Sequence, residues 1–336
     1  MNAPLRHIAV VGAGRMGEGI ALAFAQAGLQ VSLIDLKQRA AQADHFLALR
    51  RNLEAEAHSL VALELIGSVQ AEQLLARIQL LTRAQGEPAL ADCRLVFEAV
   101  PEVLAAKREA MAWIDRHAPA DGIIASTTST FLVTELAQMV SAPQRLLNAH
   151  WLNPAHLMPL VEVSRSAQTC EAKLAELLAT LQGIGKVAVV CNAAPGFIVP
   201  RLQALVMNEA ARMVEEGVAS AEQIDLAVRS GFGPRFSVLG LLEFIDWGGG
   251  DILHHASAYL SQHLGERYQA AQAVRDNMAA GRNGLREGLG FYDYRHIDVP
   301  AYRQARLAAL VQRLRQAGLA PYFASGLEAL DEPLLL

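Results

Sequence analysis

Short runs of β-branched and aliphatic residues alternate with longer stretches of helical spacing through the first half of the chain. The runs at 7–12 (H-I-A-V-V-G) and 30–35 (Q-V-S-L-I-D) flank one such helical stretch, which predicts a βαβ unit. Further strands are predicted at residues 94–99, 122–126, 146–150, 160–164 and 187–191, with a helix at 103–117 among them. Because strands that alternate with helices form parallel sheets, the pattern predicts an α/β fold with a largely parallel, doubly wound sheet.

Two segments depart from this alternation. The connection from His150 to Leu160 is too short for a crossover helix, so we expect the strands on either side to run antiparallel and the sheet to be mixed at one edge. Residues 37–79 are rich in Ala, Leu, Glu and Arg at helical spacing, with a break near Gly67 and Ser68. This stretch is predicted to be a helical hairpin.

The strand pattern ends after Cys191, and the rest of the chain has helical spacing almost throughout. A turn at 194–196 (A-P-G) is expected to open a helix at about 197–217, and an amphipathic stretch without an evident function lies at 301–316. Glycine-rich breaks in the helical part are predicted at 231–234, 248–250 and 281–290. The change of pattern predicts two domains, a sheet domain with the hairpin inserted at 1–191 and a mostly α-helical domain at 192–336.

Composition and charge exclude several classes of protein. With 52% hydrophobic and 19% charged residues, the chain is typical of a globular protein. Its formal net charge is −5 and no run of Lys or Arg occurs, so a nucleic acid is not an expected partner. The first residues lack a secretory signal and no apolar run could span a membrane, which predicts a cytoplasmic protein. The three cysteines have no CxxC spacing, so no metal site is expected.

A glycine-rich turn follows the first predicted strand. Residues 12–17 read G-A-G-R-M-G, which matches GxGxxG between a strand and a helix, the fingerprint of a Rossmann-type dinucleotide-binding sheet. Gly12, Gly14 and Gly17 permit a tight turn and the close approach of a pyrophosphate, next to Arg15 and Met16 at the start of the helix. The turn predicts a dinucleotide cofactor.

Asp35 ends the second strand of this unit, where a carboxylate can accept hydrogen bonds from an adenosine ribose. The same carboxylate would repel a 2′-phosphate, so the predicted cofactor is NAD rather than NADP. Lys37 and Arg39 lie close enough in sequence to weaken that preference.

The segment 149–163 (A-H-W-L-N-P-A-H-L-M-P-L-V-E-V) brings His150, Asn153 and Glu162 to one turn region. A carbon-bound hydroxyl gives up a hydride easily only if its proton leaves as well, so an alcohol dehydrogenase needs a group that titrates near neutrality. Histidine is the natural choice. A base and a dinucleotide site together predict hydride chemistry.

Over about residues 5–295 the chain resembles the L-3-hydroxyacyl-CoA dehydrogenase family. The motifs that match, with order and spacing kept, are the glycine turn, F-E-A-V-P-E-V at 97–103, S-T-T-S-T at 126–130, H-W-L-N-P at 150–154, L-V-E-V at 160–163 and P-G-F-I-V at 195–199. The resemblance implies an NAD-dependent oxidoreductase of fatty acid metabolism, and a homodimer formed through the helical second domain.

The resemblance also implies roles for single residues. His150 is then the general base in oxidation and the general acid in reduction, with Glu162 as its partner. Ser129 resembles the hydroxyl that binds the substrate oxygen, and Asn153 a polar group that keeps the site in register. Two further residues match family positions near the nicotinamide and the cofactor, namely Glu102 and Lys107.

Three hypotheses remain open at this point. The first is oxidation of an L-3-hydroxyacyl-CoA to the 3-oxoacyl-CoA. The second is oxidation of a small free 3-hydroxy acid, as in the carnitine dehydrogenase and lambda-crystallin branch, because Pro200 replaces the usual family Asn, the hairpin is poorly basic, and Arg235 could hold a carboxylate. The third is a non-catalytic NAD-binding structural protein, against which the retained His150 and Glu162 argue.

Overall fold

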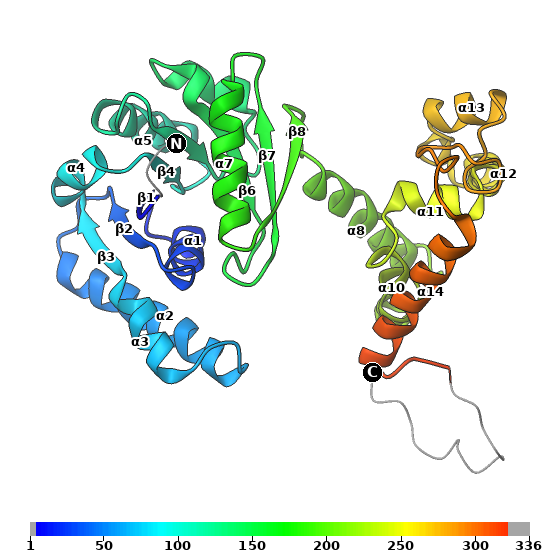
Figure 1. Ribbon diagram of the computed structural model, residues 1–336, viewed down its shortest axis with the longest axis horizontal. Coiled ribbons are helices and arrows are strands. Elements are labelled where there is room, and N and C mark those ends of the chain that lie inside the picture. The colour runs from blue at the N-terminus through cyan, green and yellow to red at the C-terminus, as the bar shows by residue number, and fades with distance from the viewer. Residues whose placement is uncertain (1–4, 322–336) are drawn as a thin grey trace, which may run out of the picture. The chain divides into compact units, whose positions relative to one another are not determined.

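The computed structural model describes residues 5–321 of the 336-residue chain. The chain divides into two compact units, 1–206 and 207–336 (Figure 1). The division falls within helix α8 (Val199–Glu215), whereas the sheet ends at Asn192. Both units contain the types of element that the sequence predicts, so the α/β fold with a mostly helical second part is confirmed.

Unit 1 is built on an eight-stranded sheet in the order β3-β2-β1-β4-β5-β6-β7-β8. The strands are β1 (His7–Val11), β2 (Gln30–Asp35), β3 (Ile78–Thr82), β4 (Leu95–Glu98), β5 (Ile123–Ser126), β6 (Leu146–Trp151), β7 (Leu160–Arg165) and β8 (Val187–Asn192). The first six strands are parallel, β7 is antiparallel to β6, and β8 is parallel to β7. The predicted mixed edge is therefore confirmed. The strand order reverses between β1 and β4, which is where open α/β sheets bind ligands.

The helices of unit 1 confirm most of the predicted pattern. They are α1 (Arg15–Gln26), α2 (Gln42–Ala62), α3 (Ser68–Ala76), α4 (Arg83–Ala91), α5 (Leu104–His117), α6 (Val133–Leu136), α7 (Glu171–Gly183) and the start of α8, with short 3₁₀ turns at Ala137–Met139 and Pro143–Arg145. Helices α2 and α3 form the predicted hairpin and break near Gly67 (Figure 1). The prediction that the hairpin extends to residue 79 is wrong, because β3 starts at Ile78 and pairs with β2.

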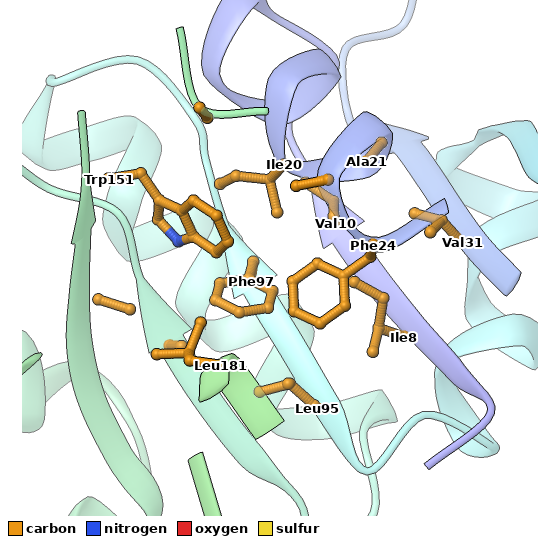
Figure 2. Close-up of a cluster of buried hydrophobic side chains, with 14 of the residues drawn as sticks. Ile8, Val10, Ile20, Ala21, Phe24, Val31, Leu95, Phe97, Trp151 and Leu181 are labelled. Carbon is orange, nitrogen blue, oxygen red and sulfur yellow. The ribbon is translucent and has the colours of Figure 1, made fainter. Parts of the chain in front are cut away.

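Both faces of the sheet are buried along its central strands. Along β1, Ile8 and Val10 belong to one core cluster and Ala9 and Val11 to another, because successive side chains point to opposite faces. This explains why the strand has no alternation of polar and apolar residues. Figure 2 shows the first cluster, in which the Phe97 ring lies 5.3 Å from that of Phe24 and 5.8 Å from that of Trp151.

Unit 2 is helical. Its elements are the end of α8, α9 (Ala221–Ala227), a π-helical turn (Val228–Phe232), α10 (Gly233–Phe236), α11 (Leu241–Gly248), α12 (Gly250–Leu264), a 3₁₀ turn (Glu266–Tyr268), α13 (Gln272–Ala279) and α14 (Val299–Gln316). The break predicted at 231–234 is wrong, because the π-helical turn runs directly into α10 there. The break at 248–250 is confirmed, since Gly249 has φ 104° between α11 and α12.

Two polar clusters hold unit 2 together. The buried Asp246 carboxylate accepts hydrogen bonds from the backbone N–H groups of Phe291 and Tyr292 at 3.0 and 2.9 Å, which fastens the irregular segment after α13 to α11. The Glu243 carboxylate accepts a hydrogen bond from the Tyr302 hydroxyl and pairs with Arg306 at 2.7 Å, which fastens α14 to the same helix. No helix within residues 5–321 is both long and apolar enough to cross a membrane.

Candidate active site

The glycine turn after β1 has one glycine that faces open space and two that do not. A Cβ on Gly12, whose φ is 117°, would lie 2.5 Å from the backbone of Ala99, and a Cβ on Gly17 would lie 1.9 Å from the Gly12 carbonyl oxygen. A Cβ on Gly14 would have nothing within 4 Å. Packing therefore requires the first and third glycines, and the second leaves room for a ligand at the start of α1, where the first N–H groups of a helix have no partner within it.

A groove with a volume of about 890 Å³ runs along this turn and past the carboxyl ends of β2, β4 and β5. The predicted residues that line it are Gly12, Gly14, Arg15, Met16, Asp35, Glu102 and Ser129. Gly17 and Lys107 are not part of this lining, since Gly17 packs on the turn and Lys107 is buried. The remaining lining includes Lys37 and Arg39, which the sequence already placed near Asp35, and two charged residues that sequence reasoning did not assign to the site, Arg83 and Glu109.

Asp35 lies at the end of β2 with its carboxylate already engaged. Arg39 Nε donates to Oδ2 at 2.7 Å, the backbone N–H of Lys37 donates to Oδ1 at 3.2 Å, and His45 Nε2 lies 3.3 Å from Oδ2. Burial by itself raises the pKa of Asp35, but the bonds from Arg39 and Lys37 outweigh it and hold the pKa below its usual range. The group at the end of β2 is therefore a carboxylate paired with a guanidinium.

A buried ion-pair network lies beneath the groove. Lys107 and Glu98 both have side chains with 0% exposure, and Lys107 Nζ lies 3.1 and 3.2 Å from the two Glu98 oxygens. The same ammonium lies 3.1 Å from Glu102 Oε2. The Ser126 hydroxyl and the Val100 N–H donate to Glu98 at 2.6 and 2.9 Å. Lys107 therefore contacts the groove lining through Glu102.

Glu102 connects this network to the loop after β5. Its Oε1 accepts hydrogen bonds from the Thr128 hydroxyl and, at 3.0 Å, from the Thr130 N–H, and these residues flank Ser129. Burial raises the pKa of Glu102, but the bonds from Thr128, Lys107 and Thr130 outweigh it and lower the pKa below its usual range. The Glu102 carboxylate thus fixes the loop that carries Ser129.

His150 and Glu162 form a buried pair. They are cross-strand partners in the antiparallel register of β6 and β7, and His150 Nδ1 donates to Glu162 Oε2 at 2.7 Å. The side chains are 6% and 1% exposed. A ring held through Nδ1 presents Nε2 as the nitrogen that can exchange a proton with a substrate.

The other oxygen of Glu162 is also occupied. Oε1 accepts hydrogen bonds from the N–H groups of Ile198 and Val199, each at 2.8 Å, where α8 begins. The Phe197 ring lies 5.5 Å from the His150 ring. The carboxylate therefore cannot rotate without breaking bonds to the backbone, and the imidazole is held from two sides.

The remaining predicted residues lie in three places. Ser129 is exposed, lines the groove and follows the carboxyl end of β5, whose parallel neighbour β6 carries His150. Asn153 is exposed in the β6–β7 connection and lines a smaller neighbouring cavity together with Arg15, which borders both. Arg235 belongs to unit 2, where its Nε donates to the Gly231 carbonyl at 2.8 Å and its guanidinium lies 5.6 Å from the centre of the Phe244 ring.

Within residues 5–321 no three His, Cys, Asp or Glu side chains converge as they would around a metal ion.

Sequence reasoning missed Glu98, Ser126 and Thr128. The sequence L-V-F-E of β4 could have indicated Glu98, because a carboxylate at the end of a fully apolar strand is buried and needs a partner.

The glycine turn at the point where the strand order reverses, together with an imidazole held by a carboxylate at the same edge of the sheet, defines an oxidoreductase that uses a dinucleotide and acts on a carbon-bound hydroxyl. Residues 7–194 match the family model described as 3-hydroxyacyl-CoA dehydrogenase, NAD binding domain, and residues 196–294 match the model of the C-terminal domain. The chain belongs to the 3-hydroxyacyl-CoA dehydrogenase family, and its cofactor is NAD. The predicted family, fold class and cofactor are thereby confirmed.

Individual relatives agree with this assignment. The chain is 35% identical to a probable 3-hydroxybutyryl-CoA dehydrogenase of Bacillus subtilis over 86% of this chain and 98% of that protein. It is 30% identical to a 5-formyl-3-hydroxy-2-methylpyridine 4-carboxylate 5-dehydrogenase of Mesorhizobium japonicum over 91% and 96%. A crystal structure of a 3-hydroxyacyl-CoA dehydrogenase from Archaeoglobus fulgidus matches with a TM-score of 0.73 and 32% identity, covering 94% of this chain and 99% of that one.

Proposed function

We propose that the chain oxidises the 3-hydroxyl group of an L-3-hydroxyacyl-CoA to the 3-oxo group, and catalyses the reverse reaction, with His150 as the group that moves the proton. The observation that carries this proposal is the 2.7 Å contact between His150 Nδ1 and Glu162 Oε2 in a chain of this family. An imidazole fixed in one tautomer by a carboxylate is suited to remove a hydroxyl proton at neutral pH.

The proton step follows from the geometry of the pair. Because Nδ1–H donates to Glu162, Nε2 is the ring nitrogen that takes the proton of the substrate hydroxyl. The ring then carries a positive charge, and the carboxylate at 2.7 Å stabilises that charge. The two backbone N–H groups that hold Glu162 Oε1 keep the carboxylate in place during the step. Ser129 is proposed to donate a hydrogen bond to the substrate oxygen and Asn153 to keep the turn in register.

The groove fits NAD. The open space at Gly14 and the N-terminus of α1 suit the pyrophosphate, and Asp35 lies where the adenosine ribose is expected. Glu102 lies at the end near Ser129, so it is proposed to border the nicotinamide, and Lys107 is proposed to hold Glu102. NAD⁺, when bound, supplies the acceptor for the hydride.

The substrate is proposed to be a short-chain acyl-CoA. The B. subtilis relative is named for 3-hydroxybutyryl-CoA, and the family favours a thioester over the free hydroxy acid that Pro200 and Arg235 suggested. Pro200 lies in the first turn of α8, where a missing N–H is tolerated, so the residue fits the fold. The M. japonicum relative, named for a pyridine carboxylate, is the reason to include free acids in the assay.

We further propose a cytoplasmic homodimer with domains at 1–191 and 192–336. The family resemblance supports the dimer, and so do exposed apolar side chains on unit 2 such as Met207 and Ile252, which are 68% and 63% exposed. Light scattering after gel filtration measures the oligomeric state, and a monomer at micromolar concentration would contradict this part of the proposal.

The test of the activity is reduction of acetoacetyl-CoA with NADH by wild type and by His150→Asn, with free acetoacetate as the second substrate. We expect the wild type to use the thioester, and the variant to lose about 100-fold or more in kcat while it still binds NADH. His117→Asn is the matched control, because His117 ends α5, where its Nδ1 donates to the Trp113 carbonyl, and it is not part of the groove lining. Wild-type turnover in His150→Asn, or activity with the free acid alone, would refute the proposal.

A further inference from the structure

Lys186 is buried immediately before β8, on the side of the sheet that carries Trp151. It is 7% exposed, and its ammonium lies 5.5 Å from the centre of the Trp151 ring. Because successive side chains of a strand point to opposite faces, Trp151 and the neighbouring His150 lie on opposite faces of β6. Lys186 is also not part of the groove lining. Any effect of Lys186 on the site must therefore pass through other residues.

The ammonium of Lys186 binds backbone carbonyls rather than a carboxylate. Its Nζ donates to the carbonyls of Ala155 and Met158, each at 2.8 Å, and to that of His156 at 3.4 Å. Within residues 5–321 no carboxylate forms an ion pair with it. An ammonium has three donors and no acceptor, so three carbonyls satisfy it. Burial lowers the pKa of Lys186, whereas these carbonyls favour the charged form.

The segment that Lys186 binds is part of the connection between His150 and Glu162. Residues 154–158 form a turn in which two backbone N–H groups donate to the Pro154 carbonyl at 3.1 and 2.9 Å. A cation at the carbonyl end of such a turn stabilises it. The turn also packs against α1, since a Cβ on Gly19 would lie 3.0 Å from the Cβ of Ala155. Two independent contacts thus hold the turn, one with α1 and one with the buried ammonium.

Asn153 comes immediately before this turn, is exposed, and lines the smaller cavity together with Arg15, which also borders the groove. Resting on the proposed function, we propose that Lys186 is a positioning residue, which fastens residues 154–158 and so holds Asn153 where the substrate binds. Without the ammonium the turn loses three hydrogen bonds, and Asn153 loses its fixed position. The dinucleotide site along the glycine turn has no contact with Lys186 and should be unaffected.

The test compares Lys186→Met with Asn153→Ala in the reduction of acetoacetyl-CoA, or of acetoacetate where the wild type uses that compound. We expect each variant to raise the KM for the substrate about tenfold, the value of about one hydrogen bond, with kcat changed less than about threefold and NADH affinity unchanged. The double variant should raise KM no further, because both substitutions remove the same contact. Lys173→Met is the matched control, because Lys173 also donates to a backbone carbonyl, that of Asp121, outside the turn. It should keep the wild-type KM.

A purely structural role of Lys186 would lower the free energy of unfolding and leave the KM of the folded variant at its wild-type value, which would overturn the inference. Additive effects in the double variant, or a wild-type KM in Asn153→Ala, would also overturn it. If Lys186→Met does not fold, Lys186→Arg takes its place. The donors of a guanidinium lie in one plane and do not match three carbonyls around an ammonium, so KM should again rise, and a wild-type KM in Lys186→Arg would overturn the inference.

These outcomes concern the inference alone. Failure of the wild type to reduce either acetoacetyl-CoA or acetoacetate would overturn the proposed function, and this inference with it.

Discussion

His150 and Glu162 face each other directly across the antiparallel strands β6 and β7, so the register of these strands sets the contact between them. The antiparallel direction is essential, since it lets a short connection bring the two side chains together. Glu162 also binds the first N–H groups of α8. One carboxylate therefore joins two strands and a helix at the position of the proposed base.

Replacement of Glu162 by Gln tests this arrangement. The amide cannot stabilise a charged imidazole, so we expect kcat to fall by about 100-fold or more, with NADH affinity unchanged because Glu162 does not line the groove. Steady-state kinetics and NADH titration measure the two quantities. Glu171→Gln, which removes an exposed carboxylate paired with Arg165, is the matched control. Normal turnover in Glu162→Gln would show that the pair has no role in the proton step.

The three glycines of the turn should respond differently to Ala. Gly17→Ala is expected to lower the free energy of unfolding by more than about 1 kcal/mol, because its Cβ would overlap the Gly12 carbonyl oxygen. Gly14→Ala has room for its Cβ and should keep wild-type stability, but the methyl group would occupy space proposed for the pyrophosphate and weaken NADH binding. Urea denaturation and NADH titration separate the two effects. Tight NADH binding by Gly14→Ala would contradict the proposed placement.

Removal of the buried Lys107 ammonium should lower the free energy of unfolding. In Lys107→Met, Glu98 remains as a buried carboxylate without a cation, so we expect a loss of about 3–5 kcal/mol in the free energy of unfolding. The double variant Lys107→Met/Glu98→Gln removes both charges and should be more stable than Lys107→Met alone. The surface variant Arg165→Met, which breaks an exposed pair with Glu171, is expected to lose no more than about 1 kcal/mol. Equal effects of the buried and surface variants would contradict the network.

Glu102 makes stability depend on pH in a defined direction. Its pKa is lower in the folded state than its ordinary value of 4.5, so its contribution is complete above that value and is lost as the pH falls through the lower, folded-state pKa. Glu102→Gln should therefore lose less stability than wild type between pH 7 and about pH 3.5, as measured by urea denaturation. If both proteins lost the same amount, the bonds from Thr128 and Lys107 would not stabilise the ionised carboxylate.

Much of the sheet could be predicted because its strands are short apolar runs between glycine turns and helices. Strand β3 could not, since the residues I-Q-L-L-T continue a Leu-rich stretch of helical composition, and only pairing with β2 decides that they are extended. The prediction of a helix break at 231–234 was wrong for a related reason. Glycine disfavours a helix only weakly, and here a π-helical turn carries the chain through it.

Of the candidate site, sequence motifs identified the glycine turn, Asp35 and the segment that contains His150 and Glu162. They did not reveal that Arg39 covers Asp35, nor that Lys107 is withdrawn from the groove into a pair with Glu98. Such contacts depend on side-chain direction and burial, which spacing along the chain does not determine. The role of Lys107 beside the cofactor stays a prediction, and its contact with the groove lining is through Glu102.

The position of His150 and Glu162 on consecutive strands has a consequence for how the chain folds. The two residues are 12 positions apart, so their contact closes a small loop at little entropic cost. The dinucleotide groove needs Val11 beside Glu98, two residues that lie much farther apart along the chain. We therefore expect the β6–β7 hairpin, which carries the proposed base, to form early in folding. The pairing of β1 with β4, on which the dinucleotide groove depends, should form later.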